Sequence, residues 1–141
     1  MDCNKYEQFE LGKLKEEKYA ELLKLRDKLY PFLAREGYTK IEDPKLHPNK
    51  IKDFLTWLKL KKIPSFGHIS VGIIHPCFKP EQEKLIPQMM KIVKKLSGQV
   101  SGEHGIGILK KKYLDPQDKK ILENVKKRTD PTNKFNQGKI I

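Results

Sequence analysis

The chain contains few cysteines, few arginines and no long apolar run. Its 141 residues include two cysteines, Cys3 and Cys77, which form no C-x-x-C pattern and in an intracellular protein indicate free thiols rather than a disulfide or a zinc ribbon. No stretch approaches the roughly 20 consecutive apolar residues of a membrane span. Residues 1–19 lack the apolar segment and cleavage site of a signal peptide. We therefore expect a soluble cytoplasmic protein, free in solution or peripheral to the inner membrane face.

Lysine supplies almost all of the positive charge. The formal net charge is +12, and a charge of this size attracts nucleic acids and anionic membrane surfaces. The chain has only three arginines, although base and phosphate recognition use arginine most. Its lysines are spread over all segments without a stripe of interleaved aromatic residues. A solvated, lysine-rich surface is favoured and no nucleic-acid partner is expected, while a basic module that binds nucleic acid or an anionic surface stays open as the alternative.

The spacing of apolar residues predicts several helices and a β-hairpin within one domain, residues 1–141. Apolar side chains recur at helical spacing over residues 13–36, with a kink expected at Pro31, and again over 49–61 and 81–96. The stretch DPQDKKILENVKKR begins with an aspartate and a proline, which are typical of a helix start. SFGHISVGIIHPCF combines β-branched and aromatic residues with internal glycines and predicts strand, tight turn and strand. Shorter strands are expected in YTKIEDP and GQVSG.

Four titratable side chains lie in two glycine-containing segments. His68 and His75 occur in GHISVGIIHP, and Glu103 and His104 occur in SGEHG. In a single extended strand the two histidines would be about 23 Å apart at roughly 3.3 Å per residue and on opposite faces. A turn around residues 70–72 would instead bring them together across a hairpin. Two imidazoles and one carboxylate are enough to bind a divalent metal and leave one position open, as a catalytic metal site requires.

The adjacent residues Glu103 and His104 are expected to have different functions. In extended backbone, neighbouring side chains point in different directions, so we assign Glu103 to the metal and His104 to general-base catalysis, because imidazole exchanges protons near neutral pH. A histidine is more often a surface or packing residue than a ligand, and the H-x6-H spacing has little specificity. The glycines of GEHGIG do not form a nucleotide-binding motif, because no strand-loop-helix unit with a downstream acidic residue surrounds them. From the residues alone, the metal site is a hypothesis.

Three motifs in a fixed order resemble one enzyme family. GHISVGIIHP, SGEHGIG and FNQGKII resemble the C-terminal portion of the FAD-linked oxidases related to D-lactate dehydrogenase, glycolate oxidase and D-2-hydroxyglutarate dehydrogenase. The resemblance extends from about Arg26 to Ile141. It implies an α+β fold, namely the second half of a ferredoxin-like cap domain followed by a tail that faces the flavin. Nothing in the chain resembles the flavin-binding domain with which relatives begin.

The resemblance also implies a role for seven residues. The ligands of a divalent metal (zinc, manganese or iron) would be His68, His75 and Glu103, and the catalytic base would be His104. Arg26 would bind the substrate carboxylate. Asn136 and Lys139 would approach the flavin. Four positions depart from the family pattern, since relatives have other residues at Val71, Ile73, Cys77 and Gln137. We interpret the first three departures as a shift in substrate preference or in turn packing.

The function expected from this resemblance is that of a part or subunit of an FAD-dependent 2-hydroxy acid dehydrogenase. FAD would be held mainly by a separate flavin-binding chain or by an N-terminal half, and the isolated chain is expected to be inactive. The sequence does not distinguish D-lactate, glycolate and 2-hydroxyglutarate as substrates. Besides the basic binding module, a truncated remnant without function stays open as an alternative.

Overall fold

The computed structural model describes residues 16–139 and divides the chain into two compact units, Met1–Glu36 and Gly37–Ile141. In the first unit, helix α1 (Glu16–Arg35) continues through Pro31. The helix expected over 13–36 is thus confirmed within the described residues, and residues 13–15 lie outside them. None of the helices among the described residues combines the length and the apolar character needed to cross a membrane.

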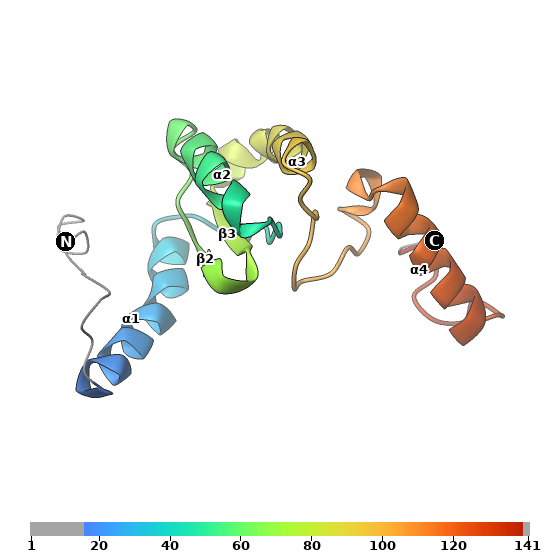
Figure 1. The fold of residues 1–141 in the computed structure, drawn as a ribbon, viewed down its shortest axis with the longest axis horizontal. Helices are drawn as coiled ribbons and strands as arrows, with labels where there is room; N and C mark the ends of the chain where they lie inside the picture. Colours follow the sequence, from blue (N-terminus) through green and yellow to red (C-terminus); the bar gives the residue numbers. More distant parts are fainter. Residues whose placement is uncertain (1–15, 140–141) are drawn as a thin grey trace. The chain divides into compact units, whose positions relative to one another are not determined.

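The second unit is built on a small antiparallel sheet with the strand order β1-β3-β2 (Figure 1). Its strands are β1 (Lys40–Ile41), β2 (Ser65–His68) and β3 (Ile73–Phe78). The last two form the expected hairpin, which turns through a single 3-10 turn, η3 (Ile69–Val71), and Gly72. Glycine is needed at this turn because φ of Gly72 is +77° and a Cβ atom there would lie 2.0 Å from the carbonyl oxygen of Leu46.

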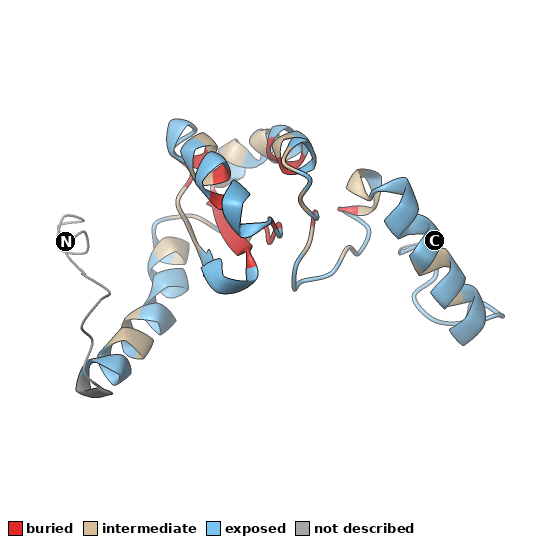
Figure 2. Cartoon of the chain, viewed as in Figure 1, coloured by how far each residue is buried: buried red, intermediate tan, exposed pale blue. Residues whose placement is uncertain are grey.

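Helices α2 (Pro48–Leu60) and α3 (Ile86–Lys95) supply most of the remaining core of the second unit. All six residues of β3 are buried, and the two helices bury their apolar sides in the same cluster (Figure 2). The cluster contains eleven buried residues: Leu46, Ile51, Phe54, Leu58, Ile63, Ile74, Phe78, Met89, Met90, Val93 and Val100. The core therefore fixes β3, and with it the position of His75.

The expected helix over 81–96 is only partly correct. Its first turns form the 3-10 helix η4 (Pro80–Leu85), and the α-helix begins at Ile86. Pro87 explains the difference, because proline has no N–H for an α-helical bond and its ring collides with the carbonyl group four residues earlier. The last helix, α4 (Pro116–Thr129), begins as expected after Asp115, whose side chain accepts a hydrogen bond from the N–H of Gln117 at 2.9 Å.

Residues 42–46 connect the hairpin to the segment 99–104. Lys45 forms isolated antiparallel bridges with Ile73 on one side and with Gln99 on the other. The segment GQVSG, expected as a strand, therefore forms one bridge rather than a strand. The observed fold class is α+β, as expected.

Candidate functional site

The hairpin places His68 and His75 on one face of the sheet. In the register, Phe66 is opposite His75 and His68 is opposite Ile73, so the two histidines are diagonal neighbours on that face. Their ring centroids are 5.8 Å apart and the rings are nearly perpendicular. His75 is 4% exposed, whereas the side chain of His68 is 51% exposed. The convergence expected from a turn around residues 70–72 is confirmed.

Glu103 reaches the two histidines from the loop that follows α3. Its carboxylate oxygens lie 3.7 Å from Nε2 of His75 and 3.8 Å from Nε2 of His68. These separations are too long for hydrogen bonds but close to the roughly 3.3 Å that separates two ligands of one tetrahedral zinc ion. One ligand atom from each of the three residues lies within 4.8 Å of the others. The exposed His68 has the freedom to turn inward, so this donor set fits a divalent metal.

Burial keeps His75 in the form that a metal ligand requires. It lowers the pKa of His75, and the neighbouring His104 and His68 lower it further, while the carboxylate of Glu103 opposes the shift. The imidazole is therefore neutral near pH 7, with one nitrogen lone pair available. Among the residues that the structure describes, Nδ1 of His75 has no hydrogen-bond partner although it is buried, and Nε2 faces Glu103. A cation between Nε2 and the carboxylate would satisfy both groups.

His104 lies against His75 rather than pointing away from the cluster. The two rings are nearly parallel, with centroids 5.3 Å apart, and the His104 residue is exposed. The extended backbone assumed at Glu103 and His104 was wrong, because the loop is a tight series of bends. Both side chains contact His75. The division of roles between metal ligand and base stays a prediction.

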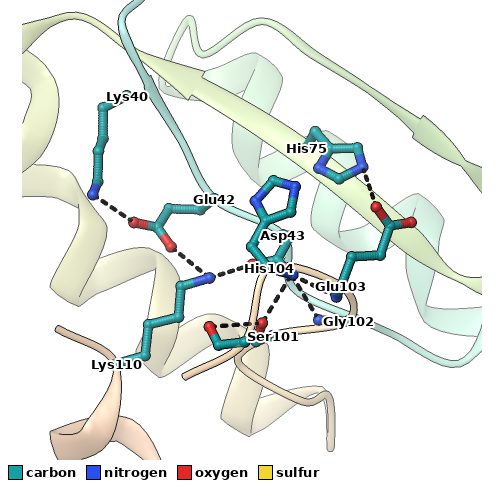
Figure 3. A network of polar contacts seen from close by, with 10 residues as sticks. Lys40, Glu42, Asp43, His75, Ser101, Gly102, Glu103, His104 and Lys110 are labelled. Atoms are coloured by element: carbon teal, nitrogen blue, oxygen red, sulfur yellow. Dashed lines mark hydrogen bonds and ion pairs between the residues drawn. The ribbon is translucent and has the colours of Figure 1, made fainter. Parts of the chain in front are cut away.

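Asp43 is a residue of this site that sequence reasoning missed. Its side chain is fully buried, and Oδ2 accepts hydrogen bonds from the Ser101 hydroxyl at 2.8 Å and from three backbone N–H groups at 3.0, 2.7 and 2.7 Å (Figure 3). These N–H groups belong to the consecutive residues Gly102, Glu103 and His104. No local pattern in IEDP signals such a role, because the partners of Oδ2 are 58 to 61 residues away.

A buried lysine completes the environment of Asp43. Lys110 Nζ donates to Oδ1 of Asp43 and lies 3.1 Å from Oε2 of Glu42. Burial by itself would raise the pKa of Asp43, but the hydrogen bonds from Lys110, from the loop amides and from Ser101 outweigh it and lower the pKa to about 2. The carboxylate is thus ionised at neutral pH, and its four other donors all come from the loop.

Arg26 belongs to the first unit. It lies on α1, where its side chain is 62% exposed and its guanidinium group pairs with Asp27 at 2.9 Å. The structure describes the two units separately, so the role of Arg26 at the substrate carboxylate stays a prediction.

Asn136 and Lys139 line an open pocket of about 580 Å³ together with α4 and with residues 105–107, which belong to the glycine-rich loop that follows the SGEH stretch. The tail that carries them is attached to α4 through Asp130, which accepts the N–H groups of Lys134 and Phe135 at 2.8 and 2.9 Å. Lys126 also donates to Asp130, and this hydrogen bond and the others from the tail lower the pKa of Asp130 to about 2. A role of Asn136 and Lys139 toward the flavin stays a prediction.

Two of the residues that depart from the family pattern, Cys77 and Ile73, are buried. Cys77 is a free thiol with no exposed surface, and burial raises its pKa to about 11. Ile73 is buried against the loop that carries Gly102. The packing there is close, since a Cβ atom at Gly102 would lie 2.8 Å from Cγ1 of Ile73. The interpretation of these departures as a shift in substrate preference or in turn packing stays a prediction. The other cysteine, Cys3, lies outside the described residues.

The chain belongs to the family described as FAD linked oxidases, C-terminal domain, which matches residues 7–140. A D-lactate dehydrogenase of Anaerostipes hadrus is 34% identical over 112 residues, which cover 65% of this chain and 24% of that protein. A D-lactate dehydrogenase of Archaeoglobus fulgidus is 28% identical over 137 residues, covering 85% of this chain and 30% of that protein. Glycolate oxidase subunit GlcD of Bacillus subtilis is 34% identical over 91 residues, covering 55% and 19%. The chain thus spans less than a third of these relatives, and the family resemblance of the sequence is confirmed.

Proposed function

We propose that this chain provides the metal-binding and proton-accepting part of an FAD-dependent dehydrogenase that oxidises 2-hydroxy acids. The observation that carries the proposal is the convergence of His68, His75 and Glu103 within 4.8 Å, with His104 stacked beside them. Relatives named D-lactate dehydrogenase and glycolate oxidase support this substrate class. D-Lactate, glycolate and 2-hydroxyglutarate are the candidate substrates.

Each residue of the site has a chemical task in this proposal. His68, His75 and Glu103 would hold a divalent metal, for which zinc, manganese and iron all suit two imidazoles and a carboxylate. Bound there, the metal would lower the pKa of the substrate hydroxyl group. His104 would accept the hydroxyl proton, because it is exposed, lies beside the cluster and is not needed as a ligand.

The remaining roles concern the substrate carboxylate and the flavin. Arg26 would bind the carboxylate, a task suited to the planar guanidinium group with its paired donors. Asn136 and Lys139 would approach the flavin from the tail beside the glycine-rich loop. FAD would supply the acceptor for the hydride. Because the chain spans less than a third of its relatives, a separate flavin-binding chain or a further segment would hold most of the FAD.

Reconstitution of activity tests this proposal. The purified chain is mixed with an FAD-loaded flavin-binding domain of this oxidase family, and reduction of an artificial electron acceptor is followed with each of the three candidate acids. We expect turnover with at least one acid in the mixture and none with either component alone. His104→Asn should lower kcat about 10²- to 10⁴-fold, the usual contribution of a general base.

His47→Asn is the matched control for this experiment. His47 is exposed, contacts Asn49 and is not part of the cluster, so its replacement should leave turnover unchanged. Equal losses in the two variants would contradict the role of His104. Absence of turnover with all three acids, in a mixture shown to contain both folded components and FAD, would contradict the proposed function.

A further inference from the structure

Asp43 touches the loop that carries Glu103 and His104, and it contributes no ligand atom to the metal cluster. Its Oδ2 receives three consecutive backbone N–H groups and a hydroxyl group. Consecutive N–H groups that point at one anion form a concave nest. The side chains of Glu103 and His104, carried by this same loop, both meet His75 (Figure 3).

The backbone around Asp43 is also bonded to the strand that carries His75. The N–H of Glu42 donates to the carbonyl oxygen of Pro76 at 3.1 Å, and the N–H of Ile74 donates to that of Pro44, also at 3.1 Å. Asp43 lies between these two bonds in the sequence, and its own carbonyl oxygen accepts the N–H of Gly102 at 2.7 Å. The three-residue segment 42–44 therefore connects the strand of His75 to the loop of Glu103, with Asp43 making the bonds to the loop.

The charge of Asp43 is necessary for this connection. A neutral carboxyl or amide group in its place would offer a weaker acceptor to the four donors, because hydrogen bonds to an ionised group are about twice as strong. Lys110 keeps the carboxylate ionised although Glu42, a second buried acid, is its neighbour in the chain. Without Lys110 the two buried carboxylates would keep only the longer ion pair of Glu42 with Lys40, at 3.8 Å, and Asp43 would lose its cation.

We infer that Asp43, whose ionised carboxylate is paired with Lys110, is a positioning residue. It holds residues 102–104 so that Glu103 and His104 both meet His75 from one loop. This inference rests on the proposed function, since it concerns the same metal and base site. Asp43 acts through the loop backbone and is not a catalytic residue. The arrangement predicts that metal affinity depends on a side chain that is not a ligand.

Titration of the purified chain with CoCl₂ tests the inference, with calorimetry giving the affinity and visible absorption reporting the ligand geometry. Asp43→Asn preserves the shape of the side chain and removes its charge. We expect the affinity for Co²⁺ to fall about 10- to 100-fold, the usual effect of losing a group that orients a metal ligand, together with a changed absorption spectrum. Asp130→Asn is the matched control, because it removes the same kind of anchor from the tail, and it should leave both quantities unchanged.

A milder variant covers the case in which Asp43→Asn does not fold by circular dichroism. Ser101→Ala removes only one of the four donors to Oδ2 and should lower Co²⁺ affinity about fivefold, as expected for one hydrogen bond. Wild-type affinity and spectrum in a folded Asp43→Asn variant, or in Ser101→Ala if that is the folded one, would overturn the inference.

Amide hydrogen exchange separates this inference from the proposed metal site. In the wild-type chain the N–H groups of residues 102–104 should exchange slowly, and in Asp43→Asn or Ser101→Ala they should exchange faster while the amides of β3 stay protected. If the wild-type chain binds no Co²⁺, the metal site itself is refuted, and exchange alone decides the role of Asp43. Unchanged exchange at residues 102–104 in the folded variant would then overturn it.

Discussion

Two segments of this chain are each held by an ionised aspartate. One aspartate bonds residues that are distant in the sequence, and the other bonds residues close to it. Asp43 and Asp130 each accept consecutive backbone N–H groups and a lysine, and the pKa of each is lowered to about 2. Asp43 is completely buried and bonds residues 58 to 67 positions away, whereas Asp130 lies closer to the surface and bonds residues four and five positions away. We conclude that the first anchor assembles a site from distant segments and that the second only shapes the end of a helix.

The largest expected difference is between Asp43→Ala and Asp130→Ala. Loss of Asp43 leaves the buried Lys110 with Glu42 as its remaining partner and the part-buried N–H groups of Glu103 and His104 without their acceptor, which should lower the free energy of unfolding by about 3 kcal/mol. Loss of Asp130 should release the tail and change the unfolding midpoint far less. Urea denaturation followed by circular dichroism measures both. Equal losses of unfolding free energy in the two variants would contradict the conclusion that only Asp43 assembles distant segments.

Replacing the lysine partners should give the next largest difference. Lys110→Met leaves the buried Glu42 and Asp43 without their shared cation and should cost about 2–3 kcal/mol of unfolding free energy. Lys126→Met removes a partly exposed ion pair, and pairs of this kind contribute little. The same denaturation experiment applies. A larger loss in Lys126→Met than in Lys110→Met would contradict the account.

Two glycines allow the rigidity of the segments to be compared without changing any charge. Gly105 and Gly138 have φ values of +76° and +71°, and a Cβ atom would have free space at either position. An alanine in this conformation costs about 1–2 kcal/mol. We expect Gly105→Ala to show the full cost, because its loop is held by Asp43, and Gly138→Ala to show less, because its tail can relax. Thermal unfolding of the two variants measures this difference. A larger loss of stability in Gly138→Ala than in Gly105→Ala would contradict the prediction.

The smallest expected effect is in the acid range. Because the pKa of Asp43 is lowered in the folded chain, its contribution to stability is present above the unfolded pKa of about 3.9 and is lost as the pH falls through about 2. The difference in unfolding free energy between wild type and Asp43→Asn should therefore be constant above pH 4 and shrink below it. For Asp130→Asn the same pH range should affect only amide exchange in residues 134 and 135. A difference for Asp43→Asn that stays constant down to pH 2 would contradict this prediction.

Local patterns predicted most of the fold. Helical spacing located α2, the aspartate and proline at its start located α4, and the glycine at position 72 with its β-branched neighbours predicted the hairpin that joins His68 to His75. The same reasoning failed at η4, where the apolar spacing is helical but Pro87 prevents an α-helical start before Ile86. The spacing of apolar residues predicts which face of a helix is buried. It does not show that the missing N–H of Pro87 makes residues 80–85 a 3-10 helix instead of an α-helix.

The candidate site could be predicted only in part, for a related reason. The two histidines are seven residues apart, so strand geometry can place them. Glu103 arrives from a loop whose position depends on Asp43, and no local signal links positions separated by some 60 residues. The assumption of extended backbone at Glu103 and His104 was also wrong, because residues 102–104 form bends whose three N–H groups turn toward one carboxylate. Long-range anchors of this kind become visible only in the folded chain.

The most direct test of the account is a calorimetric titration of the purified chain with CoCl₂, compared with His75→Ala and His47→Ala. We predict one Co²⁺ per wild-type chain, unchanged binding in His47→Ala and a loss of affinity of at least about 100-fold in His75→Ala, since removing a ligand costs more than removing a group that orients it. Absence of stoichiometric binding, or equal affinity in the two variants, would contradict the claim that His68, His75 and Glu103 form a metal site.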